Sequence, residues 1–197
     1  MTITINGNGT VTGISVGGLP DGIVDTDMLA NSAVTAAKTV VPGITEVDQW
    51  RLNSATSLGD GNDIITSNWE RVDTAPNSGN LGTGMSQSSG VWTFPSTGWW
   101  LVSFDVQAFS SDNIRYCYAI VDNAAGTQIA EAQQSIADNG SSSWGGFMSC
   151  KFIFDVTNTS ATSNQLRFRI NSEADVSLGT STNDTRTNVS FIKLAET

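Results

Sequence analysis

Carboxylates are the main candidates for chemistry in this chain, because its 197 residues include no histidine. The absence of histidine removes the usual general base, the commonest metal ligand and any serine–histidine–aspartate triad. Two carboxylates at a suitable separation can still hydrolyse glycosides, and Asp105, Glu173 and Asp175 could supply such a pair. Nothing in the sequence determines their separation, and acidic side chains are ordinarily exposed. We therefore expect no enzymatic activity and no catalytic residue.

A second acidic group, Asp60-Gly-Asn-Asp63, resembles a fragment of a calcium-binding loop. Its carboxylate and amide oxygens are suitable ligands, but the alternating ligand positions and the distal bidentate glutamate of an EF-hand loop are missing. A plain acidic turn is the favoured interpretation. The sequence thus predicts no metal site and no bound cofactor.

The two cysteines, Cys117 and Cys150, could form a disulfide. However, the N-terminus, MTITINGNGTVTG, has neither the basic region nor the apolar region of a secretory signal peptide. Disulfides are rare in proteins that fold in a reducing cytosol. Two buried free thiols are therefore favoured over a bridge.

The charge of the chain excludes some classes of partner. Nine basic against nineteen acidic residues give a net charge of −10. Such a surface repels phosphate groups, so nucleic acid and anionic membranes are poor partners. No apolar run approaches the roughly 18 residues that a membrane-spanning helix needs. We expect synthesis in the cytoplasm, no nucleic-acid binding and no membrane insertion.

From Thr45 onward, short apolar runs are separated by turns rich in Ser, Asn, Gly and Asp. The predicted strands are 47–52, 64–72, 90–94, 99–109, 115–121, 128–135, 143–156, 165–171 and 188–194. Many short strands with regular turn signals are typical of a β-sandwich or a jelly roll. The predicted fold class is therefore all-β.

The alternation within strand 99–109 separates a core face from a second face. Trp100 and Phe104 fall on one side of the pleat with other apolar residues, whereas Trp99 and Leu101 fall on the other. The first side is expected to be core. The second side also carries large apolar residues, so this strand requires cover on both faces.

The last strand, NVSFIKLA, has the same property. Val189 and Phe191 lie on one face, and Ile192 and Leu194 lie on the other. In a monomeric sandwich one of these faces would be an exposed apolar patch, and such patches usually mark association. The sequence therefore predicts self-association.

Aromatic rings and polar loops are candidates for recognition of a ligand. Tryptophans can stack on sugar rings; alternation places Trp100 in the core, whereas Trp144, beside a Ser- and Gly-rich loop, is the best candidate for an exposed ring. The polar loops 74–89, 138–143 and 173–187 could also carry recognition, which usually resides in loops on a rigid scaffold. Simple solvation of these loops is the alternative.

Residues 1–43 differ from the rest, because they contain no aromatic residue and Lys38 is their only basic residue. Short extended pieces joined by glycine turns are predicted first, followed by a short helix over 28–38 after Asp25-Thr26-Asp27. A helix of this length is marginal in isolation. The segment cannot build its own core and requires a partner.

The sequence of the second part resembles the head domains of the complement and tumour-necrosis-factor superfamily. Gly90-Val-Trp-Thr-Phe-Pro-Ser-Thr-Gly-Trp-Trp-Leu-Val-Ser-Phe104 is similar to the middle motif of that family, and Ser190-Phe-Ile-Lys-Leu194 is similar to its closing strand. The resemblance covers roughly residues 44–197. It implies a jelly roll that assembles as a homotrimer with apolar side chains along the threefold axis. The interface residues expected on this basis are Trp99, Leu101, Phe191, Ile192 and Leu194.

The N-terminal segment resembles a different group of proteins. NGNGTVTGISVGGLPDGIVDTDMLANSAVTAAK looks like the head of bacteriophage fibre proteins, especially of cyanobacterial and marine phages, and DQWRLNS (48–54) looks like the opening of their β heads. This resemblance implies that residues 1–43 attach to other virion proteins. The expected anchor residues are Ile3, Ile5, Met28, Leu29 and Val34.

Together the two resemblances imply a phage virion structural protein. The predicted domains are an attachment segment, 1–43, and a trimeric jelly-roll head, 44–197, that binds a host cell-surface glycan or protein as a tail fibre or knob. A capsid decoration protein or head fibre of the same architecture is the alternative. A lectin-like binding module unrelated to a virus is less consistent with the missing signal peptide.

Overall fold

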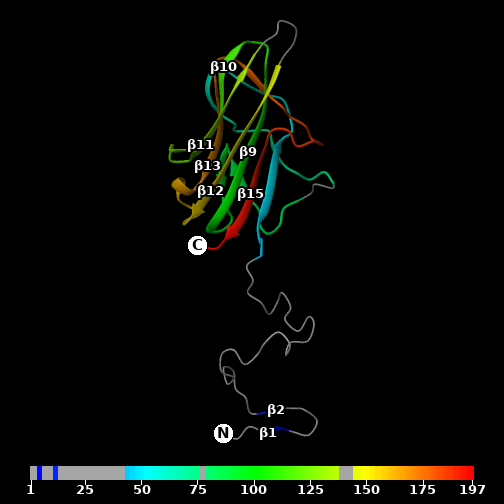
Figure 1. The fold of residues 1–197 in the computed structure, drawn as a ribbon, viewed down its shortest axis with the longest axis vertical. Helices are drawn as coiled ribbons and strands as arrows, with labels where there is room; N and C mark the ends of the chain where they lie inside the picture. Colours follow the sequence, from blue (N-terminus) through cyan, green and yellow to red (C-terminus); the bar gives the residue numbers. More distant parts are fainter. Residues whose placement is uncertain (1–3, 6–10, 13–42, 76–78, 138–143) are drawn as a thin grey trace. The chain divides into compact units, whose positions relative to one another are not determined.

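The computed structural model describes residues 4–5, 11–12, 43–75, 79–137 and 144–197, and it divides the chain into two compact units, 1–42 and 43–197 (Figure 1). In the first unit, β1 (Thr4–Ile5) pairs antiparallel with β2 (Val11–Thr12). The predicted helix over 28–38 lies outside the described residues. So do four of the five expected anchor residues, Ile3, Met28, Leu29 and Val34; only the backbone of Ile5 is described.

The second unit contains strands joined by short turns, as the predicted fold class requires. They are β3 (Val47–Leu52), β4 (Thr56–Leu58), β5 (Gly61–Ile64), β6 (Trp69–Arg71), β7 (Ser86–Ser88), β8 (Val91–Thr93), β9 (Gly98–Ser110), β10 (Ile114–Asn123), β11 (Gln128–Ile136), β12 (Trp144–Val156), β13 (Leu166–Ser172), β14 (Val176–Leu178) and β15 (Asn188–Ala195). A single 3₁₀ turn among the described residues, η2 (Thr162–Asn164), precedes β13.

These strands form two antiparallel sheets that pack face to face. One sheet has the order β11-β10-β13-β8-β7, with β5 also paired to β13; the other has the order β4-β14-β9-β15-β3-β6, with β12 also paired to β9. Figure 1 shows β12, β9 and β15 running side by side. The C-terminal strand β15 lies between β9 and β3. The predicted jelly-roll β-sandwich is confirmed.

The core lies between the sheets and follows the predicted alternation. In β9, Trp100, Val102, Phe104, Val106 and Ala108 have at most 1% of their surface exposed. The residues between them face outward. Aromatic rings from several strands meet in this core: the Trp92 ring lies 5.7 Å from Phe168 and 5.5 Å from Phe191.

One predicted strand, 64–72, is wrong in its extent. The structure ends β5 at Ile64 and begins β6 at Trp69. Between them Asn68 has a φ of 65°, in the left-handed region that interrupts a strand. The apolar residues at both ends of this segment suggested one continuous strand. The turn between them is possible because asparagine tolerates the left-handed conformation better than most residues.

The turn before β9 depends on glycine. Gly98 has a φ of 136°, and a β-carbon at this position would lie 2.4 Å from the carbonyl oxygen of Ala195. No other residue permits both the backbone conformation and this approach of the closing strand. The spacing Pro95-Ser-Thr-Gly98 thus sets where β9 meets β15.

Candidate functional site

The outer face of the β9-containing sheet carries an unpartnered row of apolar side chains. Ile153 in β12, Leu101 in β9, Ile192 in β15 and Val47 in β3 are direct cross-strand neighbours. Residues opposite one another on the same face of adjacent strands are in contact distance. Trp99 and Leu194 flank the row on β9 and β15. We name these six residues the apolar band.

The apolar band is open to solvent in the isolated chain. Ile153, Leu194 and Trp99 have 59%, 45% and 44% of their surface exposed. Leu101, Ile192 and Val47 are half-buried by their neighbours. Because contiguous exposed apolar surface usually marks an interaction site, the band is a candidate contact surface for another protein chain.

Next to the apolar band lies a row of polar side chains that bond to one another. Asp105 accepts hydrogen bonds from the hydroxyls of Ser103 (2.7 Å) and Ser149 (2.5 Å). The Gln49 amide donates to the Ser190 hydroxyl (3.0 Å). These short side chains leave the sheet surface even and partly satisfy their own polar groups. Lys151 and Asp155 flank Ile153 on the same face of β12, and Asp155 is directly opposite Trp99. A partner covering the band must therefore pair or hydrogen-bond these two charges.

Of the five expected interface residues, Phe191 has a different environment. Its side chain is 0% exposed and packs in the core against Trp92, Phe94 and Phe168. It belongs to the inward half of β15, as the alternation with Ile192 requires. We therefore leave Phe191 out of the candidate contact surface and keep Trp99, Leu101, Ile192 and Leu194.

Two exposed apolar residues of the same face were missed. Ile153 is 59% exposed and Phe147 is 60% exposed, and both lie on β12. The alternation Cys150-Lys151-Phe152-Ile153-Phe154 could have indicated that Ile153 is exposed, because Ile153 shares the face of Lys151. The sequence could not show that β12 pairs with β9 in register along its whole length, which places Ile153 opposite Leu101.

The structure does not bring the three candidate carboxylates together. Ser177 pairs with Phe109, so Asp175 lies about six residues along the sheet from Asp105, or roughly 20 Å at about 3.3 Å per residue. Glu173 follows β13 in the other sheet. A hydrolytic pair requires a separation of roughly 5 to 9.5 Å, which the Asp105–Asp175 pair exceeds.

Glu173 is committed to an ion pair with Arg115. Its carboxylate accepts hydrogen bonds from the Arg115 side chain (2.6 Å) and from the Arg115 backbone amide (2.7 Å). These hydrogen bonds lower the pKa of Glu173 and raise the pKa of Arg115. A carboxylate held ionised in this way is unsuited to the role of general acid.

The acidic turn at Asp60-Gly-Asn-Asp63 closes on itself. Asp63 lies in β5, and its carboxylate accepts a hydrogen bond from the Gly59 amide (2.9 Å). Within residues 43–75, 79–137 and 144–197, no group of three or more histidine, cysteine, aspartate or glutamate side chains is arranged to hold a metal ion. The turn therefore has a local structural role.

The tryptophans are divided between the core and the apolar band. Trp69, Trp92 and Trp100 are buried, Trp50 is half-buried against Trp92, and Trp99 is the exposed ring of the band. Trp144 begins β12, and its side chain is not among those described.

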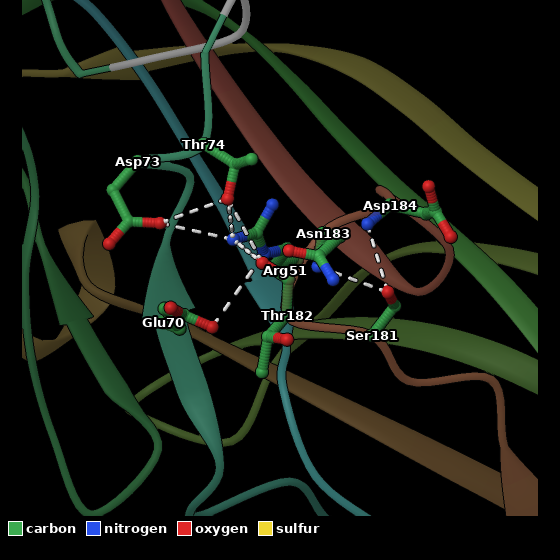
Figure 2. Close-up of polar contacts among 8 residues, drawn as sticks. All are labelled: Arg51, Glu70, Asp73, Thr74, Ser181, Thr182, Asn183 and Asp184. Atoms are coloured by element: carbon green, nitrogen blue, oxygen red, sulfur yellow. Dashed lines mark hydrogen bonds and ion pairs between the residues drawn. The ribbon is translucent and has the colours of Figure 1, made fainter.

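One of the predicted recognition loops, 173–187, is tied down by a buried arginine (Figure 2). Arg51 in β3 has 1% of its surface exposed, and its Nη2 donates to Asp73 Oδ1 (3.1 Å) and Thr74 Oγ1 (3.0 Å). The same nitrogen donates to the carbonyl oxygen of Thr182. Its Nε lies 3.6 Å from Glu70 Oε2. Arg51 thus connects two loops to one strand.

Further bonds hold the same loop on β3. The Thr74 hydroxyl donates to the Thr182 carbonyl (3.0 Å), and the Ser181 amide donates to the Leu52 carbonyl (3.0 Å). The Ser181 hydroxyl accepts from the amides of Asn183 and Asp184 (Figure 2). The loop is a fixed part of this end of the sandwich.

The two cysteines are free and buried, as predicted. The Cys150 thiol donates to the Ala119 carbonyl at 3.0 Å. Burial raises the pKa of both thiols to about 11.

The reactivity of the two thiols tests their burial. Because the thiolate is the reactive form, we expect the native protein not to react with Ellman's reagent at pH 8. In denaturant both thiols should react and release two equivalents of thionitrobenzoate per chain. Stability should also fall from about pH 9 to 11, where only the unfolded thiols ionise. Rapid native labelling would contradict this.

Comparisons with known proteins identify the fold. No protein-family profile matches the sequence, and no curated protein sequence matches it. Among solved structures, the chain is similar to Eiger TNF from S. frugiperda, with 13% identity over 77% of this chain and 93% of that chain and a TM-score of 0.54. It is also similar to murine APRIL at pH 5.0, with 15% identity over 76% and 98% and a TM-score of 0.52. The fold is therefore a tumour-necrosis-factor-like jelly roll.

A third similar structure is the PRD1 vertex protein P5, with 12% identity over 78% of this chain and 99% of that chain. Its TM-score of 0.49 is too low to establish a common fold.

Among the described residues, no helix has the length and apolar character needed to cross a membrane.

Proposed function

We propose that this chain is a non-enzymatic structural protein of a bacteriophage particle, a short homotrimeric fibre or knob. Residues 1–43 attach it to other virion proteins, and residues 44–197 form the head that binds the host surface. The tumour-necrosis-factor-like fold and the sequence resemblance of residues 1–54 to phage fibre proteins support this proposal. The single observation that carries it is the apolar band.

The apolar band favours assembly because covering it removes apolar surface from water. Burial of apolar surface stabilises an assembly by about 25 cal/mol per Å². In a trimer with threefold symmetry, the same contact occurs three times, so each chain covers the apolar band of a neighbour. Trp99, Leu101, Ile153, Ile192 and Leu194 lie together on one face, so one neighbouring face can bury all of them. A trimer also presents three equal binding sites, which allows avidity for a host surface.

The placement on the particle has an alternative. The first strand of the head begins at Val47, directly after the proposed attachment segment, so no part of this chain is left to form a shaft between them. This favours a position close to the particle surface and keeps a capsid decoration protein or head fibre as the second candidate. Electron microscopy of particles labelled with antibody against the head distinguishes a capsid position from a tail position.

The test of the proposal is the native mass of the protein. Three chains of 20.8 kDa give about 62 kDa, and we expect this mass by multi-angle light scattering. A truncated chain that starts at Thr45 should also be a trimer, because the apolar band lies entirely in the head. A monomeric full-length protein would remove the main physical support for a fibre.

A further inference from the structure

A polar groove lies on the outer face of the other sheet, on the side of the sandwich opposite the apolar band. It has a volume of about 540 Å³ and crosses β5, β13, β10 and β11. Its lining includes Tyr118, Asn171, Asn62, Asp122, Glu131 and Arg169. Apart from Asn62 in the acidic turn 60–63, none of these residues was singled out by the sequence, because they lie on ordinary amphipathic strands.

The strand register places an aromatic ring beside two amides. Tyr118 in β10 is directly opposite Asn171 in β13, and Asn171 is directly opposite Asn62 in β5. A second ring, Tyr116, lies beside Tyr118 with the ring centroids 5.6 Å apart. The rings therefore extend the groove along β10 as a half-exposed aromatic surface.

An arginine arranges the other side of the groove. Arg169 Nε donates to Asp122 Oδ2 (2.5 Å), and its Nη2 lies 3.3 Å from Asp122 Oδ1. Its Nη1 donates to Asn62 Oδ1 (2.5 Å). The Gln128 amide in turn donates to Glu131 Oε2 (2.8 Å). These bonds hold the planar polar groups in place before any ligand arrives.

Some hydrogen-bonding capacity in the groove is unused. The Asn171 amide and the Tyr118 hydroxyl make no side-chain hydrogen bond to another described residue. The Asn171 amide offers both donors and an acceptor, and a second carboxylate oxygen of Glu131 remains an acceptor. Vicinal sugar hydroxyls, which donate and accept at once, match this set, and the apolar face of a pyranose matches a tyrosine ring.

The charges in the groove select against anionic ligands. Asp122 and Glu131 carry two negative charges against the single positive charge of Arg169, which is already paired with Asp122. The whole chain carries a net charge of −10. A sialylated, sulfated or phosphorylated ligand would thus be repelled.

We propose that this groove binds a neutral oligosaccharide, with a sugar ring on Tyr118 and its hydroxyls on Asn171, Asn62 and Glu131. This inference deepens the proposed host-binding function and rests on it. In a trimer whose three apolar bands face the threefold axis, the opposite sheet faces away from the axis and the groove is open in all three chains. A single open groove binds weakly, and three together can gain a factor of roughly 10² to 10⁴ by avidity.

The test is a glycan array that displays neutral, sialylated and sulfated oligosaccharides, probed with the full-length protein. We expect binding to a neutral class, and at least a tenfold loss in Tyr118→Ala and in Asn171→Ala. Asn183→Ala is the matched control, because Asn183 is exposed in a loop outside the groove. Circular dichroism and native mass establish that each variant is folded and assembled.

The outcomes separate the two proposals. If the trimeric protein binds no neutral saccharide, binds only anionic ones, or binds equally well after both groove substitutions, the groove proposal is wrong while the fibre proposal stands. If the protein is monomeric but neutral binding depends on Tyr118 and Asn171, the groove proposal stands and the trimeric fibre fails. Loss of binding in Asn183→Ala as well would also overturn the groove assignment.

Discussion

Replacing Ile153 by aspartate should convert an assembly of about 62 kDa into a monomer of 20.8 kDa. Ile153 lies in the apolar band opposite Leu101 and is 59% exposed in the single chain. In the free chain a charge at this site faces water, so folding should change by no more than about 0.5 kcal/mol. In the trimer the same charge would be buried three times without a partner, at a cost of several kcal/mol for each copy.

Light scattering measures the mass, and circular dichroism verifies that the monomer is folded. The matched control is Ile64→Asp, which places the same charge on an exposed isoleucine of the other sheet. We expect this variant to remain a trimer. If Ile153→Asp assembles as well as the control, the apolar band is not the contact surface, and the chains must associate through another face.

The second large effect is expected at Arg51. Arg51→Met keeps most of the side-chain volume but removes the charge that joins Glu70, Asp73, Thr74 and the Thr182 carbonyl. Breaking a buried pair by removing one partner costs about 3–5 kcal/mol. Asp73 is 69% exposed, so water can solvate its carboxylate after the substitution. We therefore expect the free energy of unfolding to fall by about 3 kcal/mol, the lower end of this range. The thermal midpoint should fall by roughly 10 °C.

Thermal unfolding at one protein concentration measures this effect, and limited proteolysis should show new cleavage within 173–187. Arg186→Met is the control, because Arg186 lies in the same loop in an exposed pair with Asp184 at 3.8 Å. Exposed pairs contribute about 0–1 kcal/mol, so its midpoint should barely move. Equal stability of Arg51→Met and the wild type would mean that backbone bonds alone hold the loop.

The proposed fibre and the proposed groove assign different tasks to the two sheets. The sheet that contains β9 carries the apolar band and would face the other chains of the proposed trimer. The sheet that contains β10 carries the groove and would face outward. Both proposals use side chains that point away from the core, and neither requires a catalytic group.

Several features of the head could be predicted from the sequence because they depend on local patterns. The alternation of Trp100 and Phe104 with Trp99 and Leu101 identified the core face of β9, since successive side chains of a strand point to opposite sides. The same rule placed Ile192 and Leu194 opposite Val189. The low share of charged residues, 14%, and the glycine-rich turns indicated an all-β chain. The missing signal peptide favoured two free buried thiols over a disulfide.

Other features depended on which strands become neighbours. Phe191 was expected at the interface, but its burial against Trp92 and Phe168 follows from the packing of β15 against the opposite sheet. The short strands β7 and β14 were missed, because Ser86-Gln-Ser88 and Val176-Ser-Leu178 are too short to show a periodicity. The strand predicted over 64–72 from its apolar composition is interrupted at Asn68.

The sequence by itself determined the fold class, the core face of each long strand and the presence of surplus apolar residues, because these follow from side-chain alternation along one strand. Only the tertiary structure decided which residues form a site. The apolar band unites Ile153, Leu101, Ile192 and Val47 from four strands, and the groove unites Tyr118, Asn171 and Asn62 from three. Their proximity is set by inter-strand register, which depends on hydrogen bonds between segments far apart in the chain.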